Sequence, residues 1–472
     1  MVFQNDILAG SSGGTGTSSA VHTIGQSIRF NDDDSAYMTR TPSSAGNRRT
    51  WTWSAWLKRG NITSTMQLFN SGADDSNNSR FQINSNDVLS YVHADSGSVT
   101  DQIKTNMVLR DTSAWYNIQL VADTTNAVET ERLRLYVNGQ RITDLATTNY
   151  PTLNFDTDIN NNQAHNIGRL FSGTQYLDGY LAEIHFLDGY AYDPSYFGLF
   201  NQNGIWIPKE YSGSYGTNGF HIKGEDSADL GNDSSGNNND FTTSGLASHD
   251  FCLDSPTNNF AVLNPLDVYS TLPSNGNLKY AGSNGKARAS VGIPKSGKWY
   301  WEVRADASRL YAGLISLTNV FSTSLIITSN AGSGYYTLER QSTTNSFYNA
   351  STSSTSLGSQ TLSSGDVMAF AYDSDTRKLW IGYDGGSGSV AWYSSGDPAS
   401  GSNELATLAD DEYSVFVFDN SSLYSTSLNF GQEGTFGGTE TASGNSDANG
   451  IGNFFYSVPS GFKALCTKNL GS

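Results

Sequence analysis

The side chains best suited to chemistry lie in one polar loop, residues 233–240. Its oxygen donors fall at mostly alternating positions around a glycine, and they are Asp233, Ser235, Asn237, Asn239 and Asp240. Hard oxygen ligands of this kind suit Ca²⁺. The loop lacks the closing bidentate glutamate of an EF-hand, and runs of Asn, Asp and Gly also form ordinary turns. The sequence therefore leaves a structural calcium ion and a solvated loop as alternatives.

A second acidic stretch runs over residues 31–34, where three aspartates follow one another. Successive carboxylates repel unless a cation or water neutralises them, so Asp32 and Asp34 are further calcium candidates. The six histidines, at positions 22, 93, 165, 185, 221 and 249, are scattered and show no zinc-ligand spacing. No nucleophile elbow or phosphate-binding loop is found. Calcium is thus the only cofactor that the residues suggest.

Aromatic residues are the third candidate feature, since the chain has 25 tyrosines and 9 tryptophans. A sugar site stacks a ring on the apolar face of the sugar and uses Asn or Asp for its hydroxyls. Tyr176 precedes a strand predicted over 180–187, and Tyr190 and Tyr192 follow it, so these three could bind a ligand. The alternative is that aromatics form the core of a sandwich. We expect core positions for Trp51, Trp53, Trp299 and Trp301.

The elements that must position these residues are strands. Residues 116–139 and 366–385 each contain two alternating stretches around an Asp-led turn, and each ends at Asn-Gly or Asp-Gly. This pattern indicates a β-hairpin followed by another tight turn. A tryptophan-rich strand precedes each hairpin, over 51–57 and 299–303. The sequence therefore predicts an all-β protein with two antiparallel β-sandwich (jelly-roll) domains joined by a loop-rich connector subdomain.

The predicted organisation has five parts. They are an N-terminal docking peptide or tether (1–25), a first sandwich (26–200), the connector (201–280), a second sandwich (281–435) and a C-terminal loop with a closing strand (436–472). The first part carries four apolar residues, Val2, Phe3, Ile7 and Leu8. A plain flexible tether has no use for such residues, which favours docking onto a larger assembly.

Composition excludes several classes of partner. The formal charge is −18, which argues against binding to nucleic acid or to an anionic membrane. No apolar run reaches the length of a membrane span, and the start lacks the features of a secretory signal. The two cysteines, Cys252 and Cys466, are expected as buried thiols in a chain made in a reducing cytosol. A virion protein made in the host cytoplasm and released by lysis fits these properties.

Several motifs carry resemblances to known families. "WYNIQLVAD", "RLRLYVNGQRI" and "YLAEIHFLDGYAYDP" resemble a laminin-G-like, concanavalin-type jelly roll over about 175 residues. "SGKWYWEVRAD" and "GDVMAFAYDSDTRKLWIGYDG" resemble the SPRY fold, a sandwich used for protein recognition. "DSSGNNNDF", "DSPTNNF" and "PSGFKALCTKNL" are similar to virion and tail proteins of bacteriophages, especially marine podovirus-like ones. The laminin-G resemblance also implies calcium at the sandwich rim, near residues 31–34.

Concanavalin-type folds include glycosidases, whose retaining mechanism needs two carboxylates about 5–5.5 Å apart. In the strand 182–188, Glu183, His185 and Leu187 share one face, whereas Asp188 has the opposite parity. The second acid is therefore missing. The row Glu302, Arg304 and Asp306 is more typical of a cross-strand ion network. We expect no catalysis.

The function that these observations predict is recognition of a host-surface glycan or protein by a phage protein displayed on the virion. The expected partners are other virion proteins, bound through the N-terminal peptide, and the host surface, with no nucleic acid and no membrane insertion. A homo-oligomer is expected, and many weak sites linked on one particle would supply avidity. The alternatives are a capsid- or tail-bound decoration protein that contacts only virion neighbours, and a polysaccharide-degrading enzyme.

Overall fold

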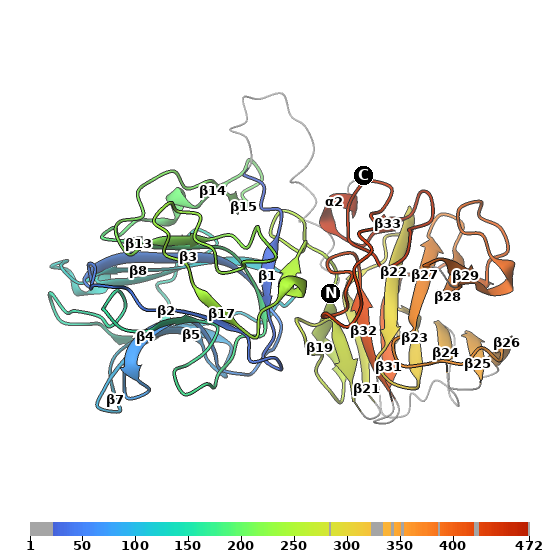
Figure 1. Cartoon of the computed structure of the whole chain (residues 1–472), viewed down its shortest axis with the longest axis horizontal. Helices are drawn as coiled ribbons and strands as arrows, with labels where there is room; N and C mark the ends of the chain where they lie inside the picture. The colour runs from blue at the N-terminus through green and yellow to red at the C-terminus, as the bar shows by residue number, and fades with distance from the viewer. Residues whose placement is uncertain are drawn as a thin grey trace. The chain divides into compact units, whose positions relative to one another are not determined.

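The computed structural model describes residues 22–470, apart from 283–284, 322–333, 341–343, 351–353, 386–387 and 420–423. The chain divides into two compact units, one ending at Thr257 and the other beginning at Asn258. Each unit is a sandwich of antiparallel sheets (Figure 1), so the predicted all-β class is confirmed. The predicted docking residues Val2, Phe3, Ile7 and Leu8 lie outside the described residues.

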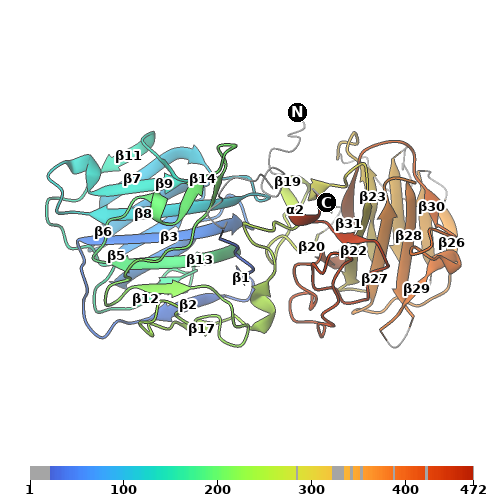
Figure 2. The same ribbon diagram turned by 90° about the horizontal axis from the view of Figure 1, so that it is seen from above.

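The first unit packs two sheets face to face, here called sheet A and sheet B (Figure 1). Sheet A has the order β10 (Gln140–Arg141), β9 (Leu133–Val137), β8 (Trp115–Asp123), β3 (Thr50–Arg59), β13 (Gly179–Asp188), β1 (Ser27–Phe30) and β18 (Phe251–Cys252), and β16 (Phe220–Ile222) also pairs with β13. Sheet B has the order β11 (Leu145–Asn149), β7 (Ser98–Val108), β6 (Val88–Asp95), β5 (Asn77–Ile83), β4 (Met66–Asp74), β12 (His165–Ile167), β2 (Tyr37–Arg40) and β17 (Thr242–Ser244). Figure 2 shows β3, β8 and β13 side by side in sheet A.

The core of the first unit follows from the period of two along β3. Trp51, Trp53, Ala55 and Leu57 all point into the space between the sheets and are fully buried, as predicted. The predicted hairpin over 116–139 is also confirmed, because β8 and β9 pair in antiparallel register. The intervening Trp56 faces the opposite side of sheet A, where it joins a separate cluster with Trp115 and Tyr180.

A long irregular segment, residues 189–257, covers the outer face of sheet A and is here called the covering segment. It contains η3 (Pro194–Tyr196), the hairpin β14 (Gly198–Phe200) and β15 (Trp206–Pro208), and η4 (Ser248–Asp250). Trp206 packs against the cluster of Trp56 and Trp115 and donates from Nε1 to Oδ1 of Asn117 at 3.1 Å. Because both faces of β13 are covered, all ten of its residues are buried.

The covering segment also changes the expected domain boundary. The predicted connector, 201–280, does not stand as one subdomain, because its residues up to Thr257 belong to the first unit and those from Asn258 to the second. The buried outer face of sheet A explains this division, since apolar residues there need cover from water. Cys252 lies in the first unit and Cys466 in the second, and each is buried, as predicted.

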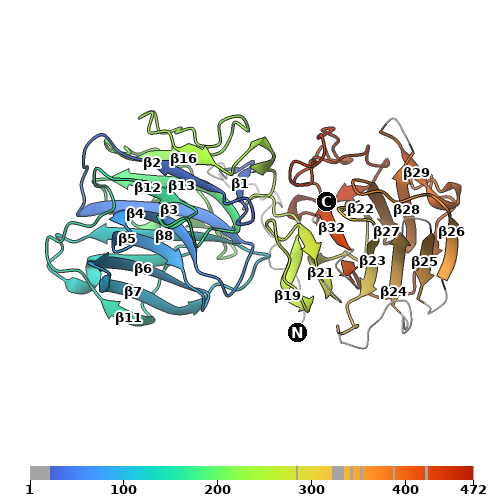
Figure 3. The ribbon, with the colours of Figure 1, turned by 60° about the horizontal axis from the view of Figure 1, so that its bottom comes forward.

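The second unit has two further sheets (Figure 3). One has the order β19 (Leu263–Tyr269), β21 (Gly285–Gly292), β31 (Tyr413–Asp419), β23 (Leu310–Ser316), β24 (Tyr335–Arg340), β25 (Asn345–Asn349) and β26 (Ser354–Gly358). The other has the order β20 (Lys279–Ala281), β32 (Ser425–Asn429), β22 (Lys298–Ala305), β27 (Val367–Asp373), β28 (Lys378–Asp384) and β29 (Val390–Trp392), with β30 (Ala406–Thr407) beside β28 and β33 (Lys463–Ala464) beside β22. The remaining short elements are η2 (Glu129–Glu131), η5 (Tyr393–Ser395) and α2 (Thr467–Leu470).

The second core confirms the expectations for β22 and for the second hairpin. Trp299 and Trp301 are buried, and β27 pairs with β28 as predicted for residues 366–385. The C-terminal part of the chain is fastened to β22 through Glu302. Both of its carboxylate oxygens are buried acceptors, and their donors are the backbone N–H groups of Phe455 and Tyr456 and the side chains of Tyr300 and Asn429.

Candidate functional site

A β-bulge lies in the middle of β13. Ala182 pairs with Trp56 and His185 with Ser54, so two residues, Glu183 and Ile184, oppose one residue of β3. Glu183 takes a φ of +50°, a conformation uncommon for residues other than glycine that costs about 1–3 kcal/mol. The extra residue turns Glu183 to the outer face of sheet A, while Ile184 returns to the core.

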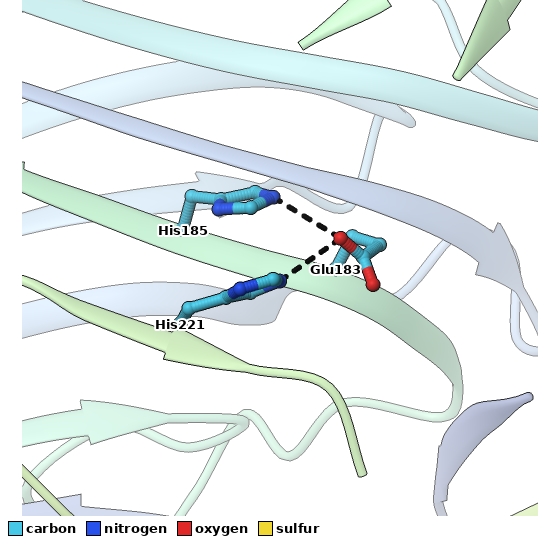
Figure 4. Close-up of side chains that lie close together, drawn as sticks. All are labelled: Glu183, His185 and His221. Atoms are coloured by element: carbon cyan, nitrogen blue, oxygen red, sulfur yellow. Dashed lines mark hydrogen bonds and ion pairs between the residues drawn. The ribbon is translucent and has the colours of Figure 1, made fainter. Parts of the chain in front are cut away.

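Strand β16 brings a second histidine to the bulge. It pairs with β13 so that His221 lies directly opposite His185, and the two rings stack with centroids 4.0 Å apart. Figure 4 shows both rings directed at the Glu183 carboxylate. The Nε2 atoms of His221 and His185 lie 2.9 and 3.4 Å from Oε2 of Glu183. His22 approaches the same oxygen with its own Nε2 at 3.5 Å.

These four residues, His22, Glu183, His185 and His221, are here called the histidine–glutamate cluster. Burial alone would raise the pKa of Glu183, but the three histidine side chains outweigh it and hold that pKa far below its usual range. Burial and the neighbouring His221 lower the pKa of His185 to about 4. Hydrogen bonding to Glu183 raises the pKa of His22. The cluster thus combines an ionised carboxylate with a neutral imidazole at His185 near neutral pH.

The surroundings of the cluster fix its orientation. The hydroxyl of Tyr215 lies 3.0 Å from Nδ1 of His185, and the backbone N–H of His221 donates to Oδ1 of Asp233 at 2.8 Å. A small pit opens beside Glu183 and His185, and Trp56, Asn117 and Lys209 are among the residues that line it. It has no space the size of a water molecule, so it cannot hold a sugar ring.

Sequence reasoning missed this cluster, and the view that the histidines are merely scattered is wrong for His22, His185 and His221. The spacing in sequence carries no signal, because the three come from the start of the described chain, from β13 and from β16. Only the register between β13 and β16 brings them together. Among the described residues, Glu183, His185 and His221 form the one group of His, Cys, Asp or Glu side chains with metal-ligand spacing.

The predicted calcium loop lies directly behind His221. The carboxylate of Asp233 accepts hydrogen bonds from the backbone of His221, Ser235 and Asn239, and the carboxylate of Asp240 accepts from the backbone of Asp233. The side-chain amides of Asn237 and Asn239 donate to carbonyls of residues 216–219. In this arrangement the loop fastens β16 and the segment before it, and calcium binding there stays a prediction.

The other calcium candidates lie in the turn after β1. Asp32 accepts from the side chain of Asn61 at 2.8 Å, and Asp34 accepts from Asn31 at 2.6 Å. Burial, followed by the negative charge of Asp33, raises the pKa of Asp32. A carboxylate whose pKa is raised in this way would be stabilised in its ionised form by a nearby cation, so the rim remains a predicted site for calcium.

Two of the three predicted ligand tyrosines belong to one aromatic array on the covering segment. Tyr190 stacks on Tyr192 with centroids 5.2 Å apart, and Tyr192 stacks on Tyr196 at 4.0 Å with planes 6° apart. Tyr196, which the sequence did not single out, is 39% exposed. These three residues are here called the tyrosine ladder. Tyr211 contacts the ladder at Tyr196, with the two ring centroids 6.4 Å apart.

The third predicted tyrosine, Tyr176, lies elsewhere. It is half-buried in the loop before β13, near Gly173, and it has none of the ring contacts that join the ladder within the described residues. The ladder is therefore built from the covering segment alone. Two exposed apolar residues of β14, Leu199 and Phe200, follow it in the chain.

The carboxylates considered for catalysis have structural partners. Asp188 is buried and accepts from the backbone of Asn47 and Asn218 and from the side chain of Asn160. In the second unit, Arg304 pairs with Asp306 at 2.5 Å and with Glu440 at 2.7 Å, as the expected ion network requires. Glu302 does not join that network, because its carboxylate is turned to the backbone of residues 455 and 456.

The second unit has a cavity of about 380 Å³ lined by loops and by residues of β27 and β31. It is lined by Ile293, Pro294, Lys295, Tyr372, Ser374, Asp375, Arg377, Asp410, Asp411 and Tyr413. Charges of both signs meet there around two tyrosines, which suits a polar ligand or a charged peptide segment better than an apolar one.

The comparisons with known proteins agree with this architecture. Residues 31–191 match the family model described as the Concanavalin A-like lectin/glucanases superfamily. The first unit therefore contains a concanavalin A-like, laminin-G-like lectin domain, and the covering segment follows this domain in the chain. No curated protein matches the chain significantly. The described residues include no helix long and apolar enough to cross a membrane.

Among solved structures, the likeness is one of fold. A putative carbohydrate binding protein from Bacteroides ovatus is 13% identical, with 47% of this chain and 58% of that one covered and a TM-score of 0.32. Domains LG4-5 of the mouse laminin alpha1 chain are 11% identical, with 88% and 90% covered and a TM-score of 0.31. The SPRY domain of human HERC1 is 16% identical, with 35% and 96% covered and a TM-score of 0.25.

Proposed function

We propose that this chain is a non-catalytic bacteriophage virion protein whose lectin-like sandwiches recognise a glycan or protein on the host surface. In this proposal the protein sits on the virion surface as a homo-oligomer and docks through its N-terminal segment. The observation that carries the proposal is the tyrosine ladder. Stacked rings lose little conformational freedom on binding, and a sugar can place its apolar face on an exposed ring.

Polar groups beside the ladder fit the same use. Asp193 and Ser195 are exposed between Tyr192 and Tyr196, and the ammonium of Lys209 donates to the carbonyl of Ser195. A sugar hydroxyl can exchange hydrogen bonds with such groups while the ring stacks on a tyrosine. A shallow site of this kind binds weakly, and copies of it on one particle would supply avidity.

Non-catalytic action fits the state of the carboxylates on β13. Glu183 is enclosed by histidines, and Asp188 is occupied by three hydrogen-bond donors. Neither is placed to protonate a glycosidic oxygen while the other attacks the sugar. The proposal therefore assigns the lectin domain to binding and not to cleavage of polysaccharide.

The test is adsorption of phage to host cells in the presence of excess purified protein, with and without a calcium chelator. We expect the wild-type protein to block adsorption and the variants Tyr192→Ala and Tyr196→Ala to block it at least about 10-fold less well. Tyr196→Ala removes the exposed ring, and Tyr192→Ala removes the ring on which Tyr196 stacks. Tyr269→Ala, a half-buried tyrosine of the second unit, is the matched control.

Unchanged adsorption at saturating protein, together with no binding of the protein to cells, would refute host recognition and favour a decoration protein that contacts only virion neighbours. Equal blocking by the ladder variants and the wild type would move the site away from the ladder. Reducing ends released from host polysaccharide would refute the non-catalytic assignment. Loss of blocking on chelation would point to the Asp and Asn loops.

A further inference from the structure

We propose that the histidine–glutamate cluster is a binding site for a transition-metal ion of the Zn²⁺ class. The candidate ligand atoms are Nε2 of His185, Nε2 of His221 and Oε2 of Glu183, which all lie within 4.8 Å of one another. Nε2 of His22 lies outside this group but 3.5 Å from the same glutamate oxygen, so a shift of its side chain would make it the fourth ligand. The first three atoms, from β13 and β16, converge on one point, and His22 lies beside them next to the glutamate oxygen.

The three distances between Glu183 and the histidines are close to those of tetrahedral coordination. Two ligands that each lie about 2.0–2.1 Å from a tetrahedral ion are about 3.3–3.4 Å apart. Oε2 of Glu183 is 3.4 Å from His185 and 3.5 Å from His22, so those two pairs need almost no movement. The pair with His221, at 2.9 Å, must open by roughly half an ångström, which a side-chain rotation provides.

The donor set selects the kind of ion. Imidazole nitrogens suit Zn²⁺, Co²⁺, Ni²⁺ and Cu²⁺, whereas Ca²⁺ and Mg²⁺ prefer sites made of oxygen. Two histidines and one glutamate supply three ligands, and a shift of the His22 side chain toward them would complete a tetrahedron of protein atoms, which is typical of structural ions. The site is therefore distinct in chemistry from the calcium candidates at residues 233–240 and 31–34.

The surroundings resemble those that hold metal ligands in place. A histidine ligand generally has a hydrogen-bond partner at its second nitrogen, and Nδ1 of His185 has the hydroxyl of Tyr215 at 3.0 Å. The strand that carries His221 is fixed by the hydrogen bond from its backbone to Asp233. The left-handed backbone of Glu183 keeps that carboxylate on the outer face, and strained residues of this kind collect at functional sites.

A bound ion would join three parts of the chain. His22 precedes β1, His185 lies on β13 and His221 on β16 of the covering segment, so coordination would add a link between these three parts. The alternative is a cluster held by hydrogen bonds alone, which the same geometry permits but which has no affinity for metal. The two alternatives differ in one measurable property, the uptake of an ion.

The experiment uses untagged full-length protein, stripped with a chelator and titrated with Co²⁺, whose visible absorption reports tetrahedral coordination. We expect about one Co²⁺ per chain, displaced by Zn²⁺ and not by Ca²⁺. His185→Gln and His221→Gln should each lower the affinity more than about 100-fold, because loss of a ligand exceeds the effect of losing its hydrogen-bond partner. His22→Ala should weaken binding by at least about 10-fold and change the absorption band, as water replaces one ligand.

The matched control is His249→Gln, a histidine of the same unit outside the cluster, which should bind Co²⁺ like the wild type. Near-ultraviolet circular dichroism checks that each variant is folded. If His185→Gln or His221→Gln fails to fold, His22→Ala decides, because the side chain of His22 is 20% exposed and lies at the edge of the cluster. Folded wild-type protein that takes up no Co²⁺ would overturn the proposal, and so would binding that survives unchanged in the cluster variants.

Discussion

Lys58 and Asp254 form an ion pair with no exposure to solvent, and breaking it is expected to destabilise the first unit strongly. Nζ of Lys58 lies 2.6 Å from Oδ2 of Asp254, and the relative exposure of both side chains is 0%. Nε1 of Trp115 donates to the other oxygen of Asp254 at 3.0 Å. The pair ties the end of the first unit, after β18, to β3 in sheet A.

The expected loss of stability depends on which buried group each substitution leaves without its partner. Lys58→Met keeps the length of the side chain but leaves a buried carboxylate without its cation, which costs about 3–5 kcal/mol. Asp254→Asn should cost less, about 1–3 kcal/mol, because burial already lowers the pKa of Lys58 and a lone lysine there can release its proton. The double variant removes both charges and keeps the bond to Trp115, so its cost should fall about 2–4 kcal/mol below the sum of the two.

The assay is thermal and urea unfolding of the full chain, with hydrogen exchange of peptides from β3 and β13 to assign the transition of the first unit. For a unit of this size, Lys58→Met should lower Tm by roughly 6–20 °C, at about 2–4 °C per kcal/mol. Lys223→Met is the matched control, since its partner Glu225 is exposed and such pairs contribute about 0–1 kcal/mol. A cost below about 1 kcal/mol for Lys58→Met, or simple additivity in the double variant, would refute the reasoning.

Three further predictions concern the other features. Burial raises the pKa of Glu302 to about 7. The free energy of unfolding of the second unit should therefore fall by up to about 3 kcal/mol as pH rises from about 4.5 to 7. Urea titrations at each pH should show this dependence in the wild type and not in Glu302→Gln. Gly219→Ala should destabilise the first unit by about 1–3 kcal/mol, because a Cβ there would lie 1.9 Å from the carbonyl oxygen of Tyr215. Gly25→Ala is the control, since a Cβ at that position has open space around it. Equal urea midpoints for the two variants would contradict the prediction. Tyr215→Phe should weaken Co²⁺ binding about 10–100-fold without changing the number of ions bound, and an unchanged titration would show that the hydroxyl does not orient His185.

The parts of the fold that the sequence predicts are those with local signals. Alternation along 51–57 places Trp51 and Trp53 in the core, and the Asp-led turns identify the hairpins of β8 with β9 and of β27 with β28. Tight turns and a period of two act over a few residues, so they can be read without knowing the rest of the chain.

The histidine–glutamate cluster depends on information of another kind. Alternation predicts Glu183 and His185 on one face. The structure has both on the outer face of sheet A, although the bulge between Ala182 and His185 interrupts the regular pairing with β3. No local pattern predicts that residues 220–222, after a long irregular segment, add a strand to β13 with His221 opposite His185. For the same reason Tyr196 was missed, because its stacking on Tyr192 depends on the turn of η3.

Backbone hydrogen bonds hold much of the covering segment in place. Asp188, at the end of β13, and Asp233, within the segment, accept hydrogen bonds from backbone N–H groups of the segment, such as those of Asn218, His221 and Asn239. Any residue except proline supplies such a donor, so these anchors do not depend on which side chains the segment displays. Exposed positions such as Tyr196 and Phe200 can therefore be exchanged while the sandwich beneath keeps its fold, and relatives with the same scaffold are expected to diverge most on this surface.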